Sequence, residues 1–286
     1  MPIEFSHLGY VYNPKTKIAT VALEDISAVI EEGSFTALIG RTGCGKSTLI
    51  QQINALLTPT SGEVTVDEYV NSSEKKKRTK KLWKVKKEVG IVFQFSEAQL
   101  FEETVEKDVM FAPKNFGMKE EEAKKAAHEA LAKVGLGEEF YSRSPFELSG
   151  GEKRRVAIAG VLAYKPKYLI LDEPTAGLDP NGAKAMMALL KEINASGTTI
   201  LVVTHDMDIV LGYAEKAIVL DEGKIARIAK PNELFEEDLE RFSLQTPAIF
   251  AFSKILNERG FALDYTSIGT VEELAKQIAS KRGKGE

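Results

Sequence analysis

Short apolar runs alternate with amphipathic stretches along most of the chain. Residues 35–39, 168–171 and 200–203 are such runs, and they are typical of strands buried on both faces of a parallel sheet. Between Gly117 and Gly137 the apolar residues recur instead with the period of an amphipathic helix. This alternation predicts an α/β fold with a mainly parallel sheet.

At the start of the chain the apolar residues recur with a shorter period. From residue 1 to about residue 35, apolar residues such as Ile3 and Phe5 stand at alternate positions, and Asn13 and Pro14 mark a turn. A period of two residues is typical of strands with one buried face. The pattern therefore predicts an antiparallel β subdomain beside the parallel sheet.

Two short helices are predicted near the C-terminus. The first begins at Pro247 and ends at Gly260. One face of it holds Ile249, Phe252, Ile255 and Leu256. The second helix follows a capping box formed by Thr270 and Glu273. These apolar faces can pack against the rest of the chain or against a second subunit, and the sequence leaves both arrangements open.

A glycine-rich segment between a predicted strand and a predicted helix carries the first candidate chemistry. It fits the pattern G-x-x-x-x-G-K-[ST], in which backbone N–H groups cradle phosphates, the lysine reaches the β- and γ-phosphates, and the hydroxyl binds Mg²⁺. Its residues are Gly40, Arg41, Thr42, Gly43, Cys44, Gly45, Lys46 and Ser47, followed by Thr48. The segment predicts a site for ATP and Mg²⁺.

Two carboxylates stand directly after the apolar run 168–171. Ligands of parallel sheets bind at the carboxyl ends of the strands, where Asp172 and Glu173 are expected. Asp172 is predicted to hold Mg²⁺ together with Ser47, directly or through water. Glu173 is predicted to act as the general base that polarises the attacking water.

A second anion-binding edge is indicated by Ser149, Gly150, Gly151 and Glu152. Ser149 is a good N-cap residue, and the two glycines allow close backbone approach at the start of a helix. Since the chain already has one phosphate cradle, a second edge implies a second nucleotide. With the cradle and the two acids, this segment resembles the signature of the ABC-type ATPases, which is usually Leu-Ser-Gly-Gly-Gln.

The resemblance implies a P-loop ABC ATPase domain at residues 1–235, with a helical subdomain at about 96–165, and a C-terminal helical extension at 236–286. It also implies that ATP binds between two subunits. In this family the signature, and an aspartate in the loop that crosses between subunits, meet the partner's ATP. The matching residues are Ser149, Gly150, Gly151, Glu152 and Asp179.

The same resemblance assigns further positions. Gln94 matches the glutamine that senses Mg²⁺ and the attacking water, and His205 matches the histidine that contacts the γ-phosphate. Tyr12 lies where the family places an aromatic residue that stacks on adenine, with Tyr10 as a close alternative. The expected catalytic residues are therefore Glu173, His205 and Gln94, and the expected metal ligands are Ser47, Gln94 and Asp172.

Two residues depart from the family pattern. Cys44 replaces a small Ser or Ala, and Glu152 replaces the common Gln of the signature. Near a helix N-terminus and Lys46, the Cys44 thiol could have a lowered pKa and be reactive, or it could be an inert small residue. If it is reactive, alkylation should block nucleotide binding and bound ATP should protect the thiol.

Composition narrows the possible functions. A net charge of -4 over 286 residues lacks the overall positive charge that is typical of nucleic-acid-binding proteins. A single cysteine excludes an intrachain disulfide and is typical of a reducing compartment. The first residues do not resemble a signal peptide, and no apolar stretch approaches the roughly 20 residues of a membrane span. Work at a membrane would therefore require another chain to bring this one there.

A basic run interrupts this ordinary charge distribution. Nine lysines and arginines lie between Lys75 and Lys87, with Trp83 among them. Such a run can be a solvated loop, a surface attracted to anionic lipid headgroups, or, with less support in an acidic chain, a nucleic-acid contact.

Residues 95–117 resemble more specifically the second ATPase subunit of energy-coupling factor transporters, which import vitamins and transition-metal ions. In that subfamily a short helix after Gln94, here about Ser96 to Leu100, forms part of a groove that grips a membrane-embedded coupling protein. Leu100 and Phe101 would serve as apolar anchors in such a helix-in-groove contact. The acids that could meet basic residues are Glu97, Glu102 and Glu103.

The resemblance thus implies an ATP-hydrolysing importer subunit, peripheral at the cytoplasmic face of a prokaryotic cell membrane. Its expected partners are a related ATPase subunit in a heterodimer, which the C-terminal helices would clasp, a transmembrane coupling subunit and a substrate-binding membrane subunit, with no nucleic acid. A soluble non-transport ABC ATPase is the alternative, but it would usually show two cassettes or a long coiled-coil insertion. A regulator that binds ATP without hydrolysing it would be expected to lack Glu173 or His205, and both residues are present.

Overall fold

The computed structural model describes residues 1–236, 239, 242, 244–264 and 268–282, and it is built around a six-stranded sheet. The strand order is β10-β9-β3-β8-β7-β6, in which only β10 is antiparallel to its neighbour. The strands are β3 (Phe35–Ile39), β6 (Val89–Val92), β7 (Tyr168–Asp172), β8 (Thr199–Val203), β9 (Lys216–Asp221) and β10 (Lys224–Ala229). The predicted mainly parallel sheet is confirmed.

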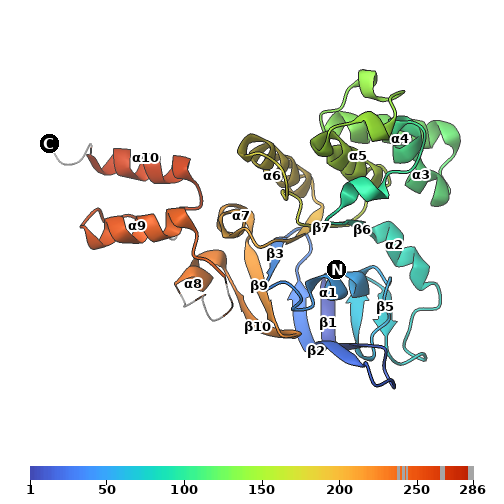
Figure 1. The fold of residues 1–286 in the computed structure, drawn as a ribbon, viewed down its shortest axis with the longest axis horizontal. Coiled ribbons are helices and arrows are strands. Elements are labelled where there is room, and N and C mark those ends of the chain that lie inside the picture. The colour runs from blue at the N-terminus through green and yellow to red at the C-terminus, as the bar shows by residue number, and fades with distance from the viewer. Residues whose placement is uncertain (237–238, 240–241, 243, 265–267, 283–286) are drawn as a thin grey trace.

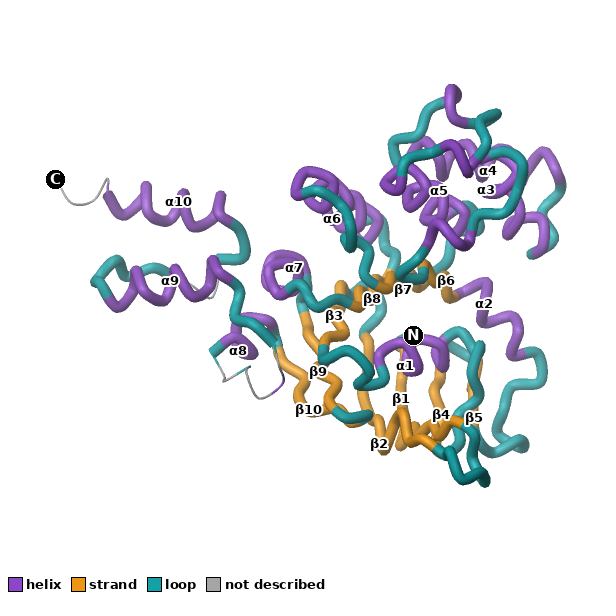
Figure 2. Tube along the Cα trace, in the orientation of Figure 1, coloured by secondary structure: helices purple, strands orange, loops and turns teal. Residues whose placement is uncertain are grey.

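A second, antiparallel sheet lies beside the first. Its order is β2-β1-β4-β5, with β1 (Ile3–Tyr12), β2 (Thr20–Ile30), β4 (Ser61–Val66) and β5 (Tyr69–Ser72). Helix α1 (Lys46–Ile53) lies between the two sheets, as Figure 2 shows, and buries Ile50 in one apolar cluster with Phe5 and Leu38. The predicted antiparallel subdomain is confirmed, and residues 61–72 add two strands to it.

Helices gather into a separate lobe beyond the β6 edge (Figure 1). This lobe contains α3 (Val105–Asn115), α4 (Glu120–Lys133) and α5 (Gly150–Leu162), with short 3-10 turns at Ser96–Gln99, Glu138–Phe140 and Pro145–Glu147. Val109, Leu131 and Ile158 come from the three helices and are fully buried in one cluster. The amphipathic helix predicted between Gly117 and Gly137 is α4.

The remaining helices before the C-terminal pair lie against the central sheet or at its β6 edge. They are α2 (Val85–Glu88), which follows a 3-10 turn at Leu82–Lys84, α6 (Pro180–Ala195), α7 (Met207–Tyr213) and α8 (Pro231–Phe235). Met187 of α6 packs with Leu171 of β7, whereas Val210 of α7 packs with Val219 of β9. Among the helices within the described ranges, none combines the length and apolar character that a bilayer crossing needs.

The C-terminal extension is a pair of helices that stands apart from both sheets. Helices α9 (Ala248–Glu258) and α10 (Val271–Arg282) lie side by side at one end of the molecule (Figure 1). Phe250 is buried against the main core, with its ring centroid 5.9 Å from that of Phe235. The predicted capping box is confirmed, because the Glu273 carboxylate accepts from the Thr270 backbone N–H at 3.0 Å.

The predicted apolar face of α9 is only partly buried. Phe252 and Ile255 are 52% and 45% exposed, whereas Phe250 and Ser253 are the residues of this helix that turn inward. The physical reason is that the chain enters α9 from the main core, so the side facing that core is the Phe250 side. Two large apolar side chains therefore remain exposed on α9.

Candidate nucleotide-binding site

The phosphate cradle connects the carboxyl end of β3 to the start of α1. Gly40 has φ +145°, and a Cβ there would lie 2.1 Å from the carbonyl oxygen of Leu220. Gly45 is the N-cap of α1 at φ +109°, and a Cβ there would lie 2.6 Å from the Ala22 carbonyl oxygen. Both positions require glycine, because a side chain would meet backbone atoms that cannot move aside.

Lys46 lies over its own loop. Its ammonium group donates to the carbonyl oxygens of Gly40 at 2.6 Å and Arg41 at 2.9 Å. The Arg41 guanidinium in turn pairs with Asp221 at 3.0 Å and Glu222 at 3.3 Å, which ties the loop to the end of β9. The cradle is thus held in shape by contacts from two sides, with a cation above it.

Asp172 and Ser47 bring two oxygen donors together at the carboxyl end of β7. The Ser47 hydroxyl donates to the Asp172 carboxylate at 3.4 Å. Burial raises the pKa of the Asp172 carboxyl above its ordinary value, and the charge of the adjacent Glu173 raises it further. A carboxylate and a hydroxyl are oxygen ligands of the kind that Mg²⁺ prefers, and a cation here would favour the ionised form of Asp172.

Glu173 and His205 form a hydrogen-bonded pair. Nδ1 of His205 lies 2.8 Å from Oε1 of Glu173, and the Glu173 side chain is only 12% exposed. The Glu173 backbone has φ +53° and donates its N–H to the carbonyl oxygen of Val203 at 2.8 Å. A left-handed backbone at a residue other than glycine is strained, and such strain is found at functional positions.

One pocket joins the cradle to this pair. It is lined by Gly40, Arg41, Thr42, Lys46, Glu173, His205, residues 206–208 and residues 244–248. The structure therefore brings together the cradle and the Glu173–His205 pair that the sequence predicted separately. The sequence did not predict residues 244–248, which run into the first residue of α9 and form one wall of the pocket.

The aromatic candidates lie at the other side of α1. The Tyr12 hydroxyl is 3.1 Å from the Thr48 hydroxyl, and the Tyr12 side chain is exposed. Tyr10 packs instead against the core, with its ring edge-on to that of Tyr12. Tyr12 is therefore the tyrosine of the two that is free to contact a nucleotide base. Gln94 is exposed in the turn after β6, the strand next to β7.

The signature segment starts helix α5 through a capping box. The Ser149 hydroxyl donates to the Glu152 carboxylate at 2.7 Å, and that carboxylate also accepts from the Ser149 backbone N–H at 2.8 Å. These bonds lower the pKa of Glu152. Ser149 and Gly151 line a second pocket together with Asp179, which caps α6. This pocket shares no lining residue with the cradle pocket.

The chain matches known proteins along nearly its whole length. The family described as "ABC transporter" matches residues 23–176. A sequence 49% identical over 98% of this chain and 97% of its own length is the energy-coupling factor transporter ATP-binding protein EcfA2 of Enterococcus faecalis. The chain belongs to the ABC transporter family of energy-coupling factor ATP-binding proteins.

Further relatives and structures agree with this family. The EcfA2 protein of Streptococcus pneumoniae is 48% identical, over 97% of this chain and 99% of that protein. The structure of cbiO1 from Clostridium perfringens, part of the ABC transporter complex cbiONQ, has a TM-score of 0.73 at 38% identity and covers 88% of this chain and 98% of its own. The ATP-binding cassette MJ0796, a post-hydrolysis dimer with ADP and Pi, has a TM-score of 0.71 at 33% identity, covering 80% and 98%.

This ABC protein contains a buried arginine that sequence reasoning missed. Nη1 of Arg154 in α5 donates to the carbonyl oxygens of Pro174 at 3.1 Å and Ala176 at 2.6 Å. It thereby joins the signature helix to the segment that follows Glu173. Helical spacing could have revealed it, because position 154 shares a face with Ile158 and Val161, and a charge on a buried face needs partners.

Replacing Arg154 by alanine is expected to lower the melting temperature by at least roughly 4 °C, since the buried Pro174 carbonyl and the half-buried Ala176 carbonyl lose their donor at about 1–3 kcal/mol each. Thermal unfolding of the wild-type protein and the variant measures the change. Lys153→Ala, one position earlier and only half-buried, should shift it by less than about 2 °C. Equal shifts for the two variants would contradict the role of Arg154.

Of the two alternatives for Cys44, the structure contradicts the reactive thiol with a lowered pKa. The residue is only 6% exposed, and burial raises the pKa of its thiol by more than the nearby Lys46 lowers it. The helix N-terminus and the lysine suggested a reactive thiol, but Cys44 points into the core cluster beneath the cradle. The structure thus favours the inert alternative.

We therefore expect iodoacetamide to modify Cys44 at least roughly tenfold more slowly in the folded protein than in denaturant, because the thiolate is disfavoured and shielded. Mass spectrometry of timed samples measures both rates. Bound ATP should slow the folded-state reaction further, since the cradle lies directly above the thiol. Equal rates in folded and denatured protein would overturn this prediction.

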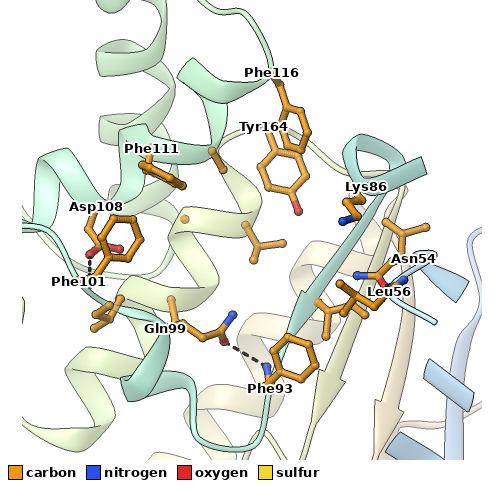
Figure 3. Close-up of a pocket in the computed structure, with 17 residues that line it drawn as sticks. Asn54, Leu56, Lys86, Phe93, Gln99, Phe101, Asp108, Phe111, Phe116 and Tyr164 are labelled. Atoms are coloured by element: carbon orange, nitrogen blue, oxygen red, sulfur yellow. Dashed lines mark hydrogen bonds between the residues drawn. The ribbon is translucent and has the colours of Figure 1, made fainter. Parts of the chain in front are cut away.

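An apolar groove lies between the helical lobe and the end of α1. Figure 3 shows Phe101, Phe111, Phe116 and Tyr164 on one side of it, with Asn54, Leu56, Lys86 and Phe93 on the other. Two hydrogen bonds hold residues 93–101 in place along the groove. The Gln99 side chain accepts from the Phe93 N–H at 3.1 Å, and the Asp108 side chain accepts from the Phe101 N–H at 2.8 Å.

The structure corrects one predicted anchor of this groove. The short helix after Gln94 is present as a 3-10 turn at Ser96–Gln99, so Leu100 is extended and turns its side chain into the core, where it is 6% exposed. Phe101 is 55% exposed and stands edge-on to Phe111, with ring centroids 4.7 Å apart. Phe101, rather than Leu100, is available to a partner.

Proposed function

We propose that this chain is an ATP-hydrolysing subunit of an energy-coupling factor importer, in which ATP use at a dimer interface drives uptake of vitamins or transition-metal ions. One observation carries the proposal: the chain presents a phosphate cradle and a capped signature in two separate pockets. Neither pocket alone encloses a nucleotide between cradle and signature. A second, related subunit supplies the missing half of each site.

ATP would be held by the cradle, with its phosphates on the loop N–H groups and Lys46 at the β- and γ-phosphates. The residues that would contact it are Gly40, Arg41, Thr42, Gly43, Cys44, Gly45, Lys46, Ser47 and Thr48. Tyr12 would stack on the adenine, which its exposure and its contact with Thr48 support. Mg²⁺ would be held by Ser47 and Asp172, with Gln94 completing the set from the neighbouring strand end.

Hydrolysis would depend on Glu173 as the base for the attacking water. His205 orients the Glu173 carboxylate through its ring nitrogen and would contact the γ-phosphate with the other side of the ring. Its side chain is 76% exposed, so it can reach a phosphate in the open pocket. Bound Mg²⁺ would supply charge stabilisation at the phosphates.

The dimer would place the signature of one subunit on the ATP of the other. The residues that would make this contact are Ser149, Gly150, Gly151, Glu152 and Asp179. Residues 1–235 would form the ATPase domain and residues 236–286 the extension that clasps the partner. Exposed apolar side chains at Phe252, Ile255 and Val271 support a contact there.

The apolar groove would receive helices of a transmembrane coupling subunit, which would work with a substrate-binding membrane subunit. Its exposed Phe101 and Phe111 suit a helix-in-groove contact. Glu97 and Glu103 at its edge are exposed, although Glu103 already pairs with Lys107 at 2.7 Å. The chain would therefore be peripheral at the cytoplasmic face of a prokaryotic cell membrane.

The test is a tagged pull-down from detergent-solubilised host membranes, with co-purifying chains identified by mass spectrometry. Recovery of a sister ATPase together with a multi-span membrane protein supports the importer. Phe101→Asp should abolish recovery of the membrane protein while the sister ATPase remains. Recovery of a homodimer alone, or of ribosomal or DNA-bound proteins, would favour a soluble ABC ATPase and overturn the transport proposal.

A further inference from the structure

A basic surface lies on the segment that joins the antiparallel sheet to β6. We define it as Trp83 and eight exposed lysines: Lys75, Lys76, Lys77, Lys80, Lys81, Lys84, Lys86 and Lys87. Arg78 belongs to the same run but turns inward, where its guanidinium donates to the Ser72 carbonyl oxygen at 2.7 and 2.9 Å. Trp83 is 61% exposed. The chain folds so that a large indole ring and a dense set of cations share one surface.

The charge of this surface is not neutralised within the chain. Over the residues that the structure describes, Lys77 is the only one of these lysines with an acidic partner, Glu74 at 2.7 Å. None of the other seven lysines has a carboxylate of a described residue within 4.0 Å. A chain with a net charge of -4 thus concentrates unpaired positive charge in 13 residues. Such a concentration produces a local positive potential that attracts anions outside the chain.

The surface borders the apolar groove. Lys86 of α2 lines the groove directly, opposite Phe111 and Tyr164 (Figure 3), and the 3-10 turn that holds Trp83 leads into α2. If the groove receives the membrane subunit, as the proposed function holds, the basic surface is carried toward the same bilayer. This orientation rests on the proposed function, whereas the composition and exposure of the surface do not.

We propose that the basic surface binds anionic phospholipid headgroups at the membrane. Unpaired lysines attract an anionic leaflet over a distance of about 10 Å, and each contributes roughly a fivefold factor to the partition coefficient. An exposed indole prefers the headgroup region, where its ring is apolar on one side and its N–H meets water. The indole distinguishes this surface from a merely solvated loop, because solvation explains the lysines but not Trp83.

Trp83 is the only tryptophan of the chain, so the protein carries its own reporter. The full chain is titrated with vesicles of 30% phosphatidylglycerol in phosphatidylcholine, and separately with vesicles of phosphatidylcholine alone. Expected results are a blue shift of Trp83 emission and quenching by brominated lipid tails, with anionic vesicles only. Raising salt from 50 to 500 mM should weaken binding at least tenfold.

A matched pair of triple variants tests the residues. The first variant changes Lys76, Lys80 and Lys81 to glutamine. It should partition to anionic vesicles roughly a hundredfold more weakly, with unchanged ATPase activity. Lys125, Lys191 and Lys254 are exposed on α4, α6 and α9, and changing these three to glutamine should lower partitioning by less than fivefold. Equal losses in the two variants would overturn the proposal, because only net charge would then matter.

Other outcomes also decide the question. Equal binding to neutral vesicles, an unchanged emission spectrum, or lysine-dependent binding of single-stranded DNA in place of vesicles would each overturn the lipid assignment. A further outcome is that the wild type binds no vesicles, while the triple variant of Lys76, Lys80 and Lys81 loses the membrane subunit in the pull-down. This outcome would assign the surface to an acidic segment of that subunit. Because the vesicle assay uses this chain alone, its failure leaves the importer proposal standing.

Discussion

Glu173→Gln is expected to slow ATP turnover by roughly 10²–10⁴-fold while ATP binding persists. Glutamine keeps the size of the side chain, and its oxygen can still accept a hydrogen bond from His205, so the pocket should not change shape. It cannot take up a proton from the attacking water at neutral pH, and that step is lost. Single-turnover phosphate release measures the chemical step, and a fluorescent ATP analogue measures binding.

Two controls make the Glu173 result specific. Glu215→Gln removes an exposed carboxylate before β9 and should leave turnover within about twofold of wild type. His205→Ala in the Glu173→Gln background should cost much less than His205→Ala alone, because the two side chains are hydrogen-bonded and act together. Full turnover in Glu173→Gln would remove Glu173 as the base.

Lys46→Ala is expected to weaken ATP binding by roughly 10–100-fold. A hydrogen bond to a charged group contributes about 1.5–3 kcal/mol, and the lysine ammonium is the cation placed above the loop. This ammonium binds the carbonyl oxygens of Gly40 and Arg41, and contact with phosphate oxygens would require it to exchange those partners. Equilibrium titration with a fluorescent ATP analogue, with and without Mg²⁺, gives the two affinities.

Lys191→Ala is the matched control for this prediction, since Lys191 is exposed on α6. Its affinity for the analogue should equal that of the wild type. Thermal unfolding without nucleotide should differ little between Lys46→Ala and wild type, whereas the stabilisation by saturating ATP should shrink in the variant. Unchanged affinity in Lys46→Ala would contradict the assignment of the cradle.

The parts of the site that depend on local sequence were predictable. A cradle such as residues 40–47 is made by its own glycines, its lysine and the strand and helix on either side, so its pattern is sufficient to recognise it. The buried strands were equally clear, because a run such as 168–171 has no polar residue to place in water. The same holds for the capping box of Thr270 and Glu273.

The parts that depend on distant contacts were not predictable. Strands β4 and β5 become recognisable through their pairing, β4 with β1 and β5 with β4, and we found no local pattern for them in the sequence. The pKa of the Cys44 thiol depends on whether burial or a neighbouring charge has the larger effect, and that balance is known only once the packing around the thiol is known. The inward direction of the Leu100 side chain results from a 3-10 turn that ends one residue before the predicted helix end. A shift of one residue is enough to turn a side chain inward.

Residues 244–248 form a wall of the cradle pocket and also lead directly into α9. A chain shortened before residue 244 would therefore have an altered cradle pocket as well as lacking α9 and α10. Affinities measured on such a fragment would describe a different site. Conversely, a ligand in this pocket would lie against the residues that begin α9, so spectroscopic labels on α9 are expected to report its occupancy.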